Sequence, residues 1–229
     1  MTVSLVKTDT KEAPFAWSYS RLRNFERCAR RYHEVDILKN FKEESEQLQE
    51  GLDVHQALAK RIAQGAALPE RMPYEHWIDY VSKGTGVPKA EKKLAITRDF
   101  RPCDFFAKDT WLRAVADVLR IDGQHAHIVD WKTGKVKPDL DQLIILATCV
   151  MVHYPRVHYV TAELVWLKEN TQTTRQWAMP DLVEVWRKTL RDRVNTLGQA
   201  HEEKNFPPNP SSGLCMRWCP VTSCEHCGQ

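Results

Sequence analysis

The sequence predicts an α+β fold. Residues 112–132 contain two apolar runs on either side of Asp122-Gly123-Gln124, which is the pattern of a β-hairpin. Further strands are expected at 157–167 and 175–179, and helical periodicity marks segments before and after them. The length of 229 residues suits one domain, with a helical part at 18–90, a core at 91–180 and a C-terminal helix and cysteine-rich segment at 181–229.

The individual elements follow from local signals. Pro138 and the acids after it indicate a helix start, and Asp181 suits the cap of a final helix. The charged stretch 39–50 is predicted to be a linker or an exposed helix. The remaining expected elements are helices at 20–33, 51–64, 73–82 and 138–152, and a strand at 91–98. The buried stripe of the final helix is expected to comprise Leu182, Val185, Trp186, Leu190, Val194 and Leu197.

Composition limits the function less than these patterns do. The net charge of +3 is only weakly basic, so charge alone does not indicate a nucleic-acid partner. Residues 1–15 contain no apolar signal-peptide core, and the longest apolar run, 143–152, is well below the ~20 residues that span a bilayer. We therefore expect a cytoplasmic protein with no membrane partner, in the host-cell cytoplasm if a phage encodes it.

The predicted hairpin carries two carboxylates in unusual places. Asp117 interrupts one apolar run and Asp130 ends the other, with Lys132 two residues later. A turn at Asp122-Gly123 would put Asp117 opposite Ile128, and a turn at Gly123-Gln124 would put it opposite Asp130. Either register places Asp117, Asp130 and Lys132 on one face, whereas a three-residue loop would need a bulge. This set suits a Mg²⁺ or Mn²⁺ site acting on phosphate, and a buried Asp–Lys ion pair explains it equally well.

Asp117 with Asp130-Trp131-Lys132-Thr133-Gly134 resembles the core of the PD-(D/E)XK nuclease superfamily, and most closely its RecB-like branch. The resemblance implies a restriction-endonuclease-like central mixed sheet flanked by helices. It implies that His55, Asp117 and Asp130 bind one or two Mg²⁺ or Mn²⁺ ions, with the Trp131 carbonyl as a further ligand. Lys132 would activate or place the attacking water.

Two upstream residues extend this resemblance. Gly51-Leu52-Asp53-Val54-His55 is similar to the branch's helix with a metal-binding histidine, and helical spacing puts His55 on the apolar face with Leu52, Ala59 and Ile62. A histidine there can also be an ordinary core residue. Glu91 fits the acidic residue that opens the strand before the hairpin, or it is a solvated charge beside two lysines.

Gln142-Leu143 matches the branch's "Q-L-x-x-Y" helix, in which the glutamine lies near the metal. Leu146 stands in the tyrosine position, so the resemblance assigns Gln142 alone to the site.

Cysteines form the second constellation. Four of the seven lie in residues 215–227, and clustered cysteines in an intracellular protein suggest metal. One interpretation is a local zinc knuckle, although only Cys224 and Cys227 have the usual spacing. Cys103 and Cys149 are expected to be buried small residues.

The other interpretation includes Cys28. The stretch from Ser18 to Cys28 resembles the N-terminal pattern of the AddB-type iron–sulfur branch, which also includes CRISPR adaptation nucleases and is similar to phage exonucleases. There one N-terminal cysteine joins three C-terminal ones. The resemblance implies that Cys28, Cys215, Cys219 and Cys224 hold a structural [4Fe–4S] cluster, with Zn²⁺ as the alternative and Cys227 spare or a replacement ligand.

Basic residues supply a candidate DNA contact. On the helix predicted at 20–33, an apolar stripe lies opposite a basic one, which can follow a phosphate backbone or be a solvated face. The basic stripe comprises Arg23, Arg27, Arg30 and Arg31.

The resemblance thus implies a metal-dependent deoxyribonuclease, of exonuclease type, in DNA recombination, repair or phage DNA processing. Its partners would be single-stranded DNA or duplex ends, with a homo-oligomer or a recombination protein as further partners. The alternatives are a catalytically silent DNA-binding scaffold subunit and a zinc-knuckle binding protein.

Overall fold

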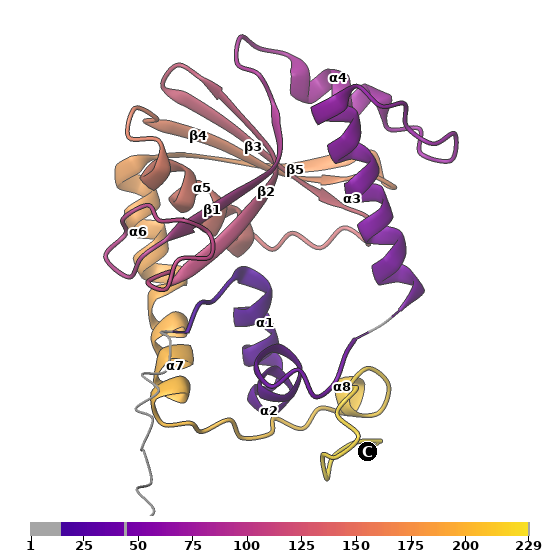
Figure 1. The fold of residues 1–229 in the computed structure, drawn as a ribbon, viewed down its shortest axis with the longest axis vertical. Helices are drawn as coiled ribbons and strands as arrows, with labels where there is room; N and C mark the ends of the chain where they lie inside the picture. Colours follow the sequence, from indigo (N-terminus) through magenta and orange to yellow (C-terminus); the bar gives the residue numbers. More distant parts are fainter. Residues whose placement is uncertain (1–14, 44, 229) are drawn as a thin grey trace, which may run out of the picture.

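The computed structural model describes residues 15–43 and 45–228, and its centre is one five-stranded sheet (Figure 1). The strands lie in sequence order, and all neighbours are antiparallel except β3 and β4, which are parallel. The predicted mixed sheet is therefore confirmed. The strands are β1 (Lys89–Ile96), β2 (Leu112–Asp122), β3 (His125–Lys132), β4 (Tyr159–Trp166) and β5 (Thr171–Ala178).

Helices cover both faces of the sheet. The crossover helix α5 (Asp141–His153) joins the parallel pair, as such a connection requires, and it is buried continuously from Leu143 to Met151. On the opposite face, α3 (Glu46–Gln64) and α4 (Glu75–Ser82) enclose a second core with Val129 and Trp131 of β3. Both faces of β3 are thus shielded from water, which isolates its last residues.

The terminal helices pack together beside the α5 face (Figure 1). The predicted helix 20–33 is interrupted, because Cys28 is extended (φ −164°, ψ 112°) and its sulfur accepts the Arg31 N–H at 3.5 Å. The predicted final helix is likewise two helices, which meet at fully buried Leu190. These elements are α1 (Tyr19–Arg27), α2 (Ala29–Tyr32), a π-helical turn (His33–Ile37), α6 (Met179–Thr189), α7 (Arg191–Glu202) and α8 (Ser212–Cys215).

The start of α3 also differs from the expected position. Ser45 caps the helix by accepting the Leu48 N–H at 3.1 Å, so the helix begins five residues earlier than predicted, at Glu46 rather than Gly51. Leu52 is 58% exposed, while Val54 and Leu58 face the core. His55 therefore lies at the border of the apolar face and not in its middle.

Other predicted boundaries shift by a few residues, the largest change being β5, which begins at Thr171 instead of residue 175. None of the described helices is long and apolar enough to cross a membrane. Residues 1–14, most of the stretch inspected for a signal peptide, lie outside the described residues.

A buried carboxylate holds α4 onto the sheet. Glu163 of β4 is 2% exposed and accepts hydrogen bonds from Tyr80 of α4 at 2.9 Å and from Thr174 of β5 at 2.9 Å, with His127 Nε2 of β3 also at 2.9 Å. Burial acts to raise the pKa of Glu163, but the hydrogen bonds, with that of His127 foremost, lower it overall. The sequence predicted neither this network nor its position across β3, β4 and β5.

Glu163→Gln should lower the free energy of unfolding at neutral pH by about 1.5–3 kcal/mol, the range for a hydrogen bond to a charged group. Because folding lowers the pKa of Glu163, its contribution is complete above the ordinary value of 4.5 and disappears as the pH falls through the folded value. Urea unfolding between pH 3 and pH 8, with exposed Glu70→Gln as control, measures this. A difference between parent and variant that is constant over this range would contradict the charged network.

Candidate active site

The β2–β3 hairpin adopts the second of the two registers considered. Asp122 pairs with His125, so the turn is Gly123-Gln124, and Gly123 has the positive φ of 58° that such a turn needs. The paired residues extend to Val118 and Val129. One step further in this register, Asp117 lies opposite Asp130.

At that step the backbone pairing of β2 and β3 ends, and the Asp117 side chain becomes the partner of the next β3 donor. Its Oδ2 accepts the Trp131 N–H at 2.8 Å, in place of a strand carbonyl. Burial alternation also breaks here: Ala116 and Leu119 pack in the α5-side core, with Val118 in the α3-side core. Asp117 therefore points to the α3 side, and not to the α5 side that regular alternation from Val118 would give it.

The expectation that Asp117, Asp130 and Lys132 stand in one row on one face is consequently wrong. Asp130 and Lys132 contact Gln142 of α5, whereas Asp117 contacts His55 of α3. The bulge-like break at Asp117 is the physical reason. The three side chains still converge, because they border the point where β2 and β3 part.

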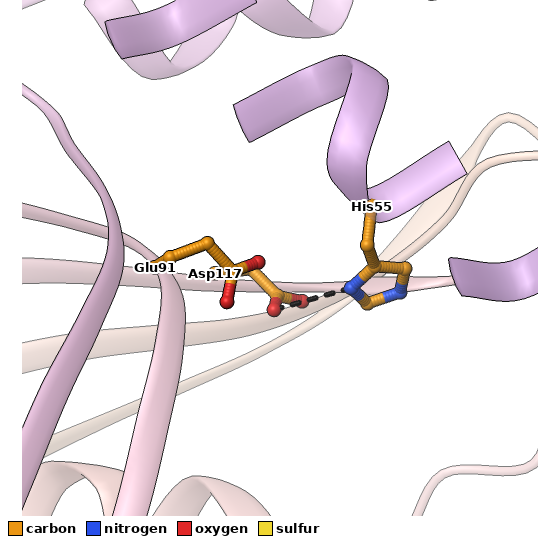
Figure 2. A group of neighbouring side chains, drawn as sticks. All are labelled: His55, Glu91 and Asp117. Carbon is orange, nitrogen blue, oxygen red and sulfur yellow. Dashed lines mark ion pairs between the residues drawn. The ribbon is translucent and has the colours of Figure 1, made fainter. Parts of the chain in front are cut away.

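Three side chains on the α3 side form a possible metal site (Figure 2). His55 Nδ1 lies 3.2 Å from Asp117 Oδ1, and one ligand atom each of His55, Glu91 and Asp117 lies within 4.8 Å of the others. Figure 2 shows the His55 ring directed from α3 toward Asp117, with Glu91 beside that carboxylate. One imidazole nitrogen and two carboxylates are donors that suit Mn²⁺, and the carboxylates suit Mg²⁺.

Glu91 reaches this group through an unusual backbone conformation. It has φ of 49°, in the left-handed region, and the β1–β2 pairing passes from Ala90–Val118 to Lys92–Ala116 around it. Such strain in a non-glycine residue is typical of functional sites. Of the two interpretations of Glu91, its position favours the site residue.

The charges in the group favour a cation. Burial, and then the charge of Asp117, raise the pKa of Glu91. For His55, burial acts to lower the pKa, but the hydrogen bond and charge of Asp117 raise it overall. The charge of Asp117 opposes ionisation of Glu91 and draws His55 toward protonation, and a bound divalent ion would relieve this concentration of negative charge.

The second group lies on the α5 side. Asp130 is 3% exposed, its Oδ2 is 2.5 Å from Lys132 Nζ, and its Oδ1 accepts a short hydrogen bond from Gln142 Nε2. Lys132 Nζ in turn donates to Gln142 Oε1 at 2.7 Å. Burial raises the pKa of Asp130 to about 6 against the opposing charge of Lys132, and the charge of Asp117 adds to the rise. The lysine is thus held in one orientation by two partners.

Comparison with known proteins identifies the family. A family model described as the PD-(D/E)XK nuclease superfamily matches residues 16–226. The chain belongs to the PD-(D/E)XK nuclease superfamily. A search of curated proteins finds no match.

Two solved structures are similar to this superfamily member. One is SSO0001, at 14% identity and a TM-score of 0.43, covering 92% of this chain and 85% of that one. The other is a candidate exonuclease from Eubacterium rectale, at 12% identity and a TM-score of 0.47, covering 93% of this chain and 91% of that one.

The two groups lie close enough to interact electrostatically. The charges of Asp130 and Lys132 act on His55, and the charge of Asp117 acts on Asp130, so both sides of the hairpin are electrostatically coupled. The structure brings together all six predicted catalytic residues, namely His55, Glu91, Asp117, Asp130, Lys132 and Gln142. The Trp131 side chain lies in the α3-side core, and its carbonyl as a ligand stays a prediction.

A close contact between α3 and the loop after β3 explains the glycine before His55. A Cβ at Gly51 would lie 3.3 Å from the Thr133 hydroxyl, which is tighter than most such contacts. The absence of a side chain therefore lets α3 approach the residues that follow Lys132.

The expected basic stripe is only partly exposed. Arg27 and Arg30 are exposed, and Arg23 pairs with Glu26 at 3.2 Å and Asp139 at 3.4 Å. Arg31 is buried at 2% exposure, which contradicts its expected place on the outer face. The break at Cys28 rotates Arg31 inward, so it cannot contact DNA from that helix face.

The structure gathers the predicted cysteines. Cys28, Cys215, Cys219, Cys224 and Cys227 line one small cavity together with Arg31. The Asn209 N–H donates to the Cys28 sulfur at 3.4 Å, so the C-terminal segment lies against the α1–α2 break. Cys149 is buried as expected, and Cys103 is half-buried.

A divalent ion at His55, Glu91 and Asp117 should stabilise the fold. At a Mn²⁺ concentration 100 times its dissociation constant, the gain is about 2.7 kcal/mol. Glu91→Gln and Asp117→Asn should remove most of this gain, and the asparagine can still accept the Trp131 N–H. Thermal unfolding with and without Mn²⁺ tests this. The control is exposed Glu46→Gln on α3, the helix that carries His55. Equal gains in all four proteins would place the ion elsewhere.

Proposed function

We propose that the protein is a metal-dependent deoxyribonuclease that hydrolyses phosphodiester bonds, with His55, Glu91, Asp117, Asp130, Lys132 and Gln142 as its active site. One observation carries this proposal. The candidate metal ligands His55, Glu91 and Asp117, called the ligand group, lie beside the oriented Lys132 at the point where β2 and β3 separate. Superfamily membership, which implies a nucleic-acid substrate, supports it.

Each group has a distinct role. His55, Glu91 and Asp117 would hold Mg²⁺ or Mn²⁺ together with Asp130, and the bound ion would stabilise charge on the phosphate. Lys132 would position the attacking water by donating a hydrogen bond to it, and its charge would stabilise the negative charge on the phosphate. Gln142 fixes Lys132 and Asp130 relative to each other through its two amide atoms, which donate to the carboxylate and accept from the ammonium.

Exonuclease action in recombination, repair or phage DNA processing is the finer part of the proposal. It rests on the similarity of the Asp130–Gly134 and Gln142 segments to the RecB-like branch. A silent DNA-binding scaffold would have no need of the strained Glu91 backbone or the oriented lysine.

Lys132→Ala and Asp130→Asn should each slow DNA cleavage by at least about 100-fold, the lower range for loss of one group that stabilises charge in the transition state. The assay is digestion of end-labelled and circular DNA, single- and double-stranded, with Mg²⁺ or Mn²⁺. Exposed Lys135→Ala, three residues from Lys132, is the control for charge. An Asp130→Asn protein as active as the parent would remove the catalytic assignment, and cleavage of circles would exclude a pure exonuclease.

We further propose that Cys28, Cys215, Cys219 and Cys224 hold a [4Fe–4S] cluster, with Zn²⁺ as the alternative. The fit to an anionic thiolate group is supported by Arg31, whose Nη2 pairs with Glu43 at 2.5 Å. Its Nε and Nη1 are buried without a hydrogen-bond partner in the described part of the chain. Burial raises the pKa of the Cys219 thiol, and the charge of Arg31 acts against that rise. The sulfurs of four thiolates on a metal group would supply negative charge and acceptors for these two unpaired donors of Arg31.

Cys28→Ala should remove most bound iron and lower the melting temperature, because the cluster would join the α1–α2 break to the C-terminus. Cys227→Ala should keep the iron, and half-buried Cys103→Ala controls for loss of a thiol. Iron and zinc analysis, with visible absorbance, distinguishes the two metals. Unchanged metal content and melting temperature in Cys28→Ala would contradict a metal group that links the α1–α2 break to the C-terminal segment.

A further inference from the structure

We propose that Phe105 and Phe106, in the loop between β1 and β2, form a stacking site for an unpaired nucleotide of a DNA strand entering the active site. The inference rests on the proposed nuclease function, and it specifies the form of substrate and the residues that select it.

The aromatic pair is built for contact with a partner outside the chain. Phe106 is 76% exposed, and the two rings lie edge to face with centroids 5.1 Å apart and an interplanar angle of 84°. A phenylalanine exposed to this extent gains little from packing within its own fold. The T-shaped contact joins the two rings and leaves Phe106 exposed, so a planar base can stack on it.

Two cations accompany the rings. Lys93 Nζ and the Arg113 guanidinium carbon each lie 5.6 Å from the centroids of both rings. Arg113 is held in place because its Nε donates to the Phe105 carbonyl at 2.7 Å. Aromatic rings beside fixed positive charges are the combination by which proteins bind single strands, since bases stack and phosphates pair with the cations.

A cavity extends from Phe105 to Gln142, the hydrogen-bond partner of Lys132. This cavity of about 390 Å³ is lined by Phe105 and Arg113 and also by Gln142, which contacts Asp130 and Lys132. Tyr19 and Arg21 of α1 line it as well. Lys93 lies two residues after Glu91 on β1, so one strand carries a metal ligand and a platform cation.

The platform selects unpaired nucleotides for a geometric reason. In a duplex each base is stacked on both faces by its neighbours, and its edges lie inside the grooves. A base must leave that stack before Phe106 can cover its face. Stacking also tolerates any base, so the site predicts a preference for single-stranded DNA or frayed ends without sequence selectivity.

The test is DNA binding in metal-free buffer, where cleavage cannot interfere, with labelled single-stranded and duplex oligonucleotides of one sequence. Phe106→Ala should weaken single-strand binding about 5- to 100-fold and leave duplex binding nearly unchanged. Phe106→Trp should restore it, and Lys93→Gln should reduce its salt dependence. Tyr159→Ala, an aromatic residue 59% exposed at the far end of the sheet, is the matched control and should bind like the parent.

Single-strand binding by Phe106→Ala equal to that of the parent, or an equal loss on both DNA forms, would overturn the stacking site. The two proposals separate cleanly. If the parent cleaves DNA but Phe106 is irrelevant to binding, the nuclease stands and the platform falls. If Phe106 governs single-strand binding but the parent cleaves nothing, the platform stands and the nuclease falls.

Discussion

The hydrogen bond from the Trp131 N–H to the Asp117 carboxylate is the contact on which the site depends. A buried backbone donor needs a partner, and a buried carboxylate needs donors or cations. By meeting both needs at once, this contact lets β2 and β3 part while the Trp131 N–H and one Asp117 oxygen each keep a partner. The parting leaves the second Asp117 oxygen for His55 and gives Asp130 room to face α5. The charged side chains of the site are therefore brought together where β2 and β3 separate, and the Trp131–Asp117 hydrogen bond stabilises that separation.

The sequence predicted much of this because its strongest signals are local. The turn at Gly123 allowed two registers, one of which the structure adopts, and the carboxylates stood out because they interrupt apolar runs. The interruption of alternation between Ala116 and Leu119 was not predictable, since it depends on which core each neighbour enters. For the same reason the shared face was wrong, although the residues named for the site do meet.

Long-range partners account for the other differences. Helical periodicity favoured a continuous helix through Cys28, but the sulfur of Cys28 accepts one N–H from Arg31 and another from Asn209, far along the chain. That second contact is invisible to any local pattern, and it turns Arg31 from a surface residue into a buried cation beside the cysteines. Glu91 likewise looked like a solvated acid beside lysines, because its left-handed backbone appears only once β1 lies against β2.

Strand β1 connects the chemistry to the substrate path. Its third residue, Glu91, reaches the ligand group because its backbone is strained, and such strain persists only where neighbouring pairs fix the strand on both sides. Those pairs, from Lys89 to Ile96, also fix Lys93 and the start of the loop that carries Phe105. The position of the metal ligand Glu91 and the path proposed for the DNA strand are in this way both set by β1. A short stretch of sequence can therefore specify both.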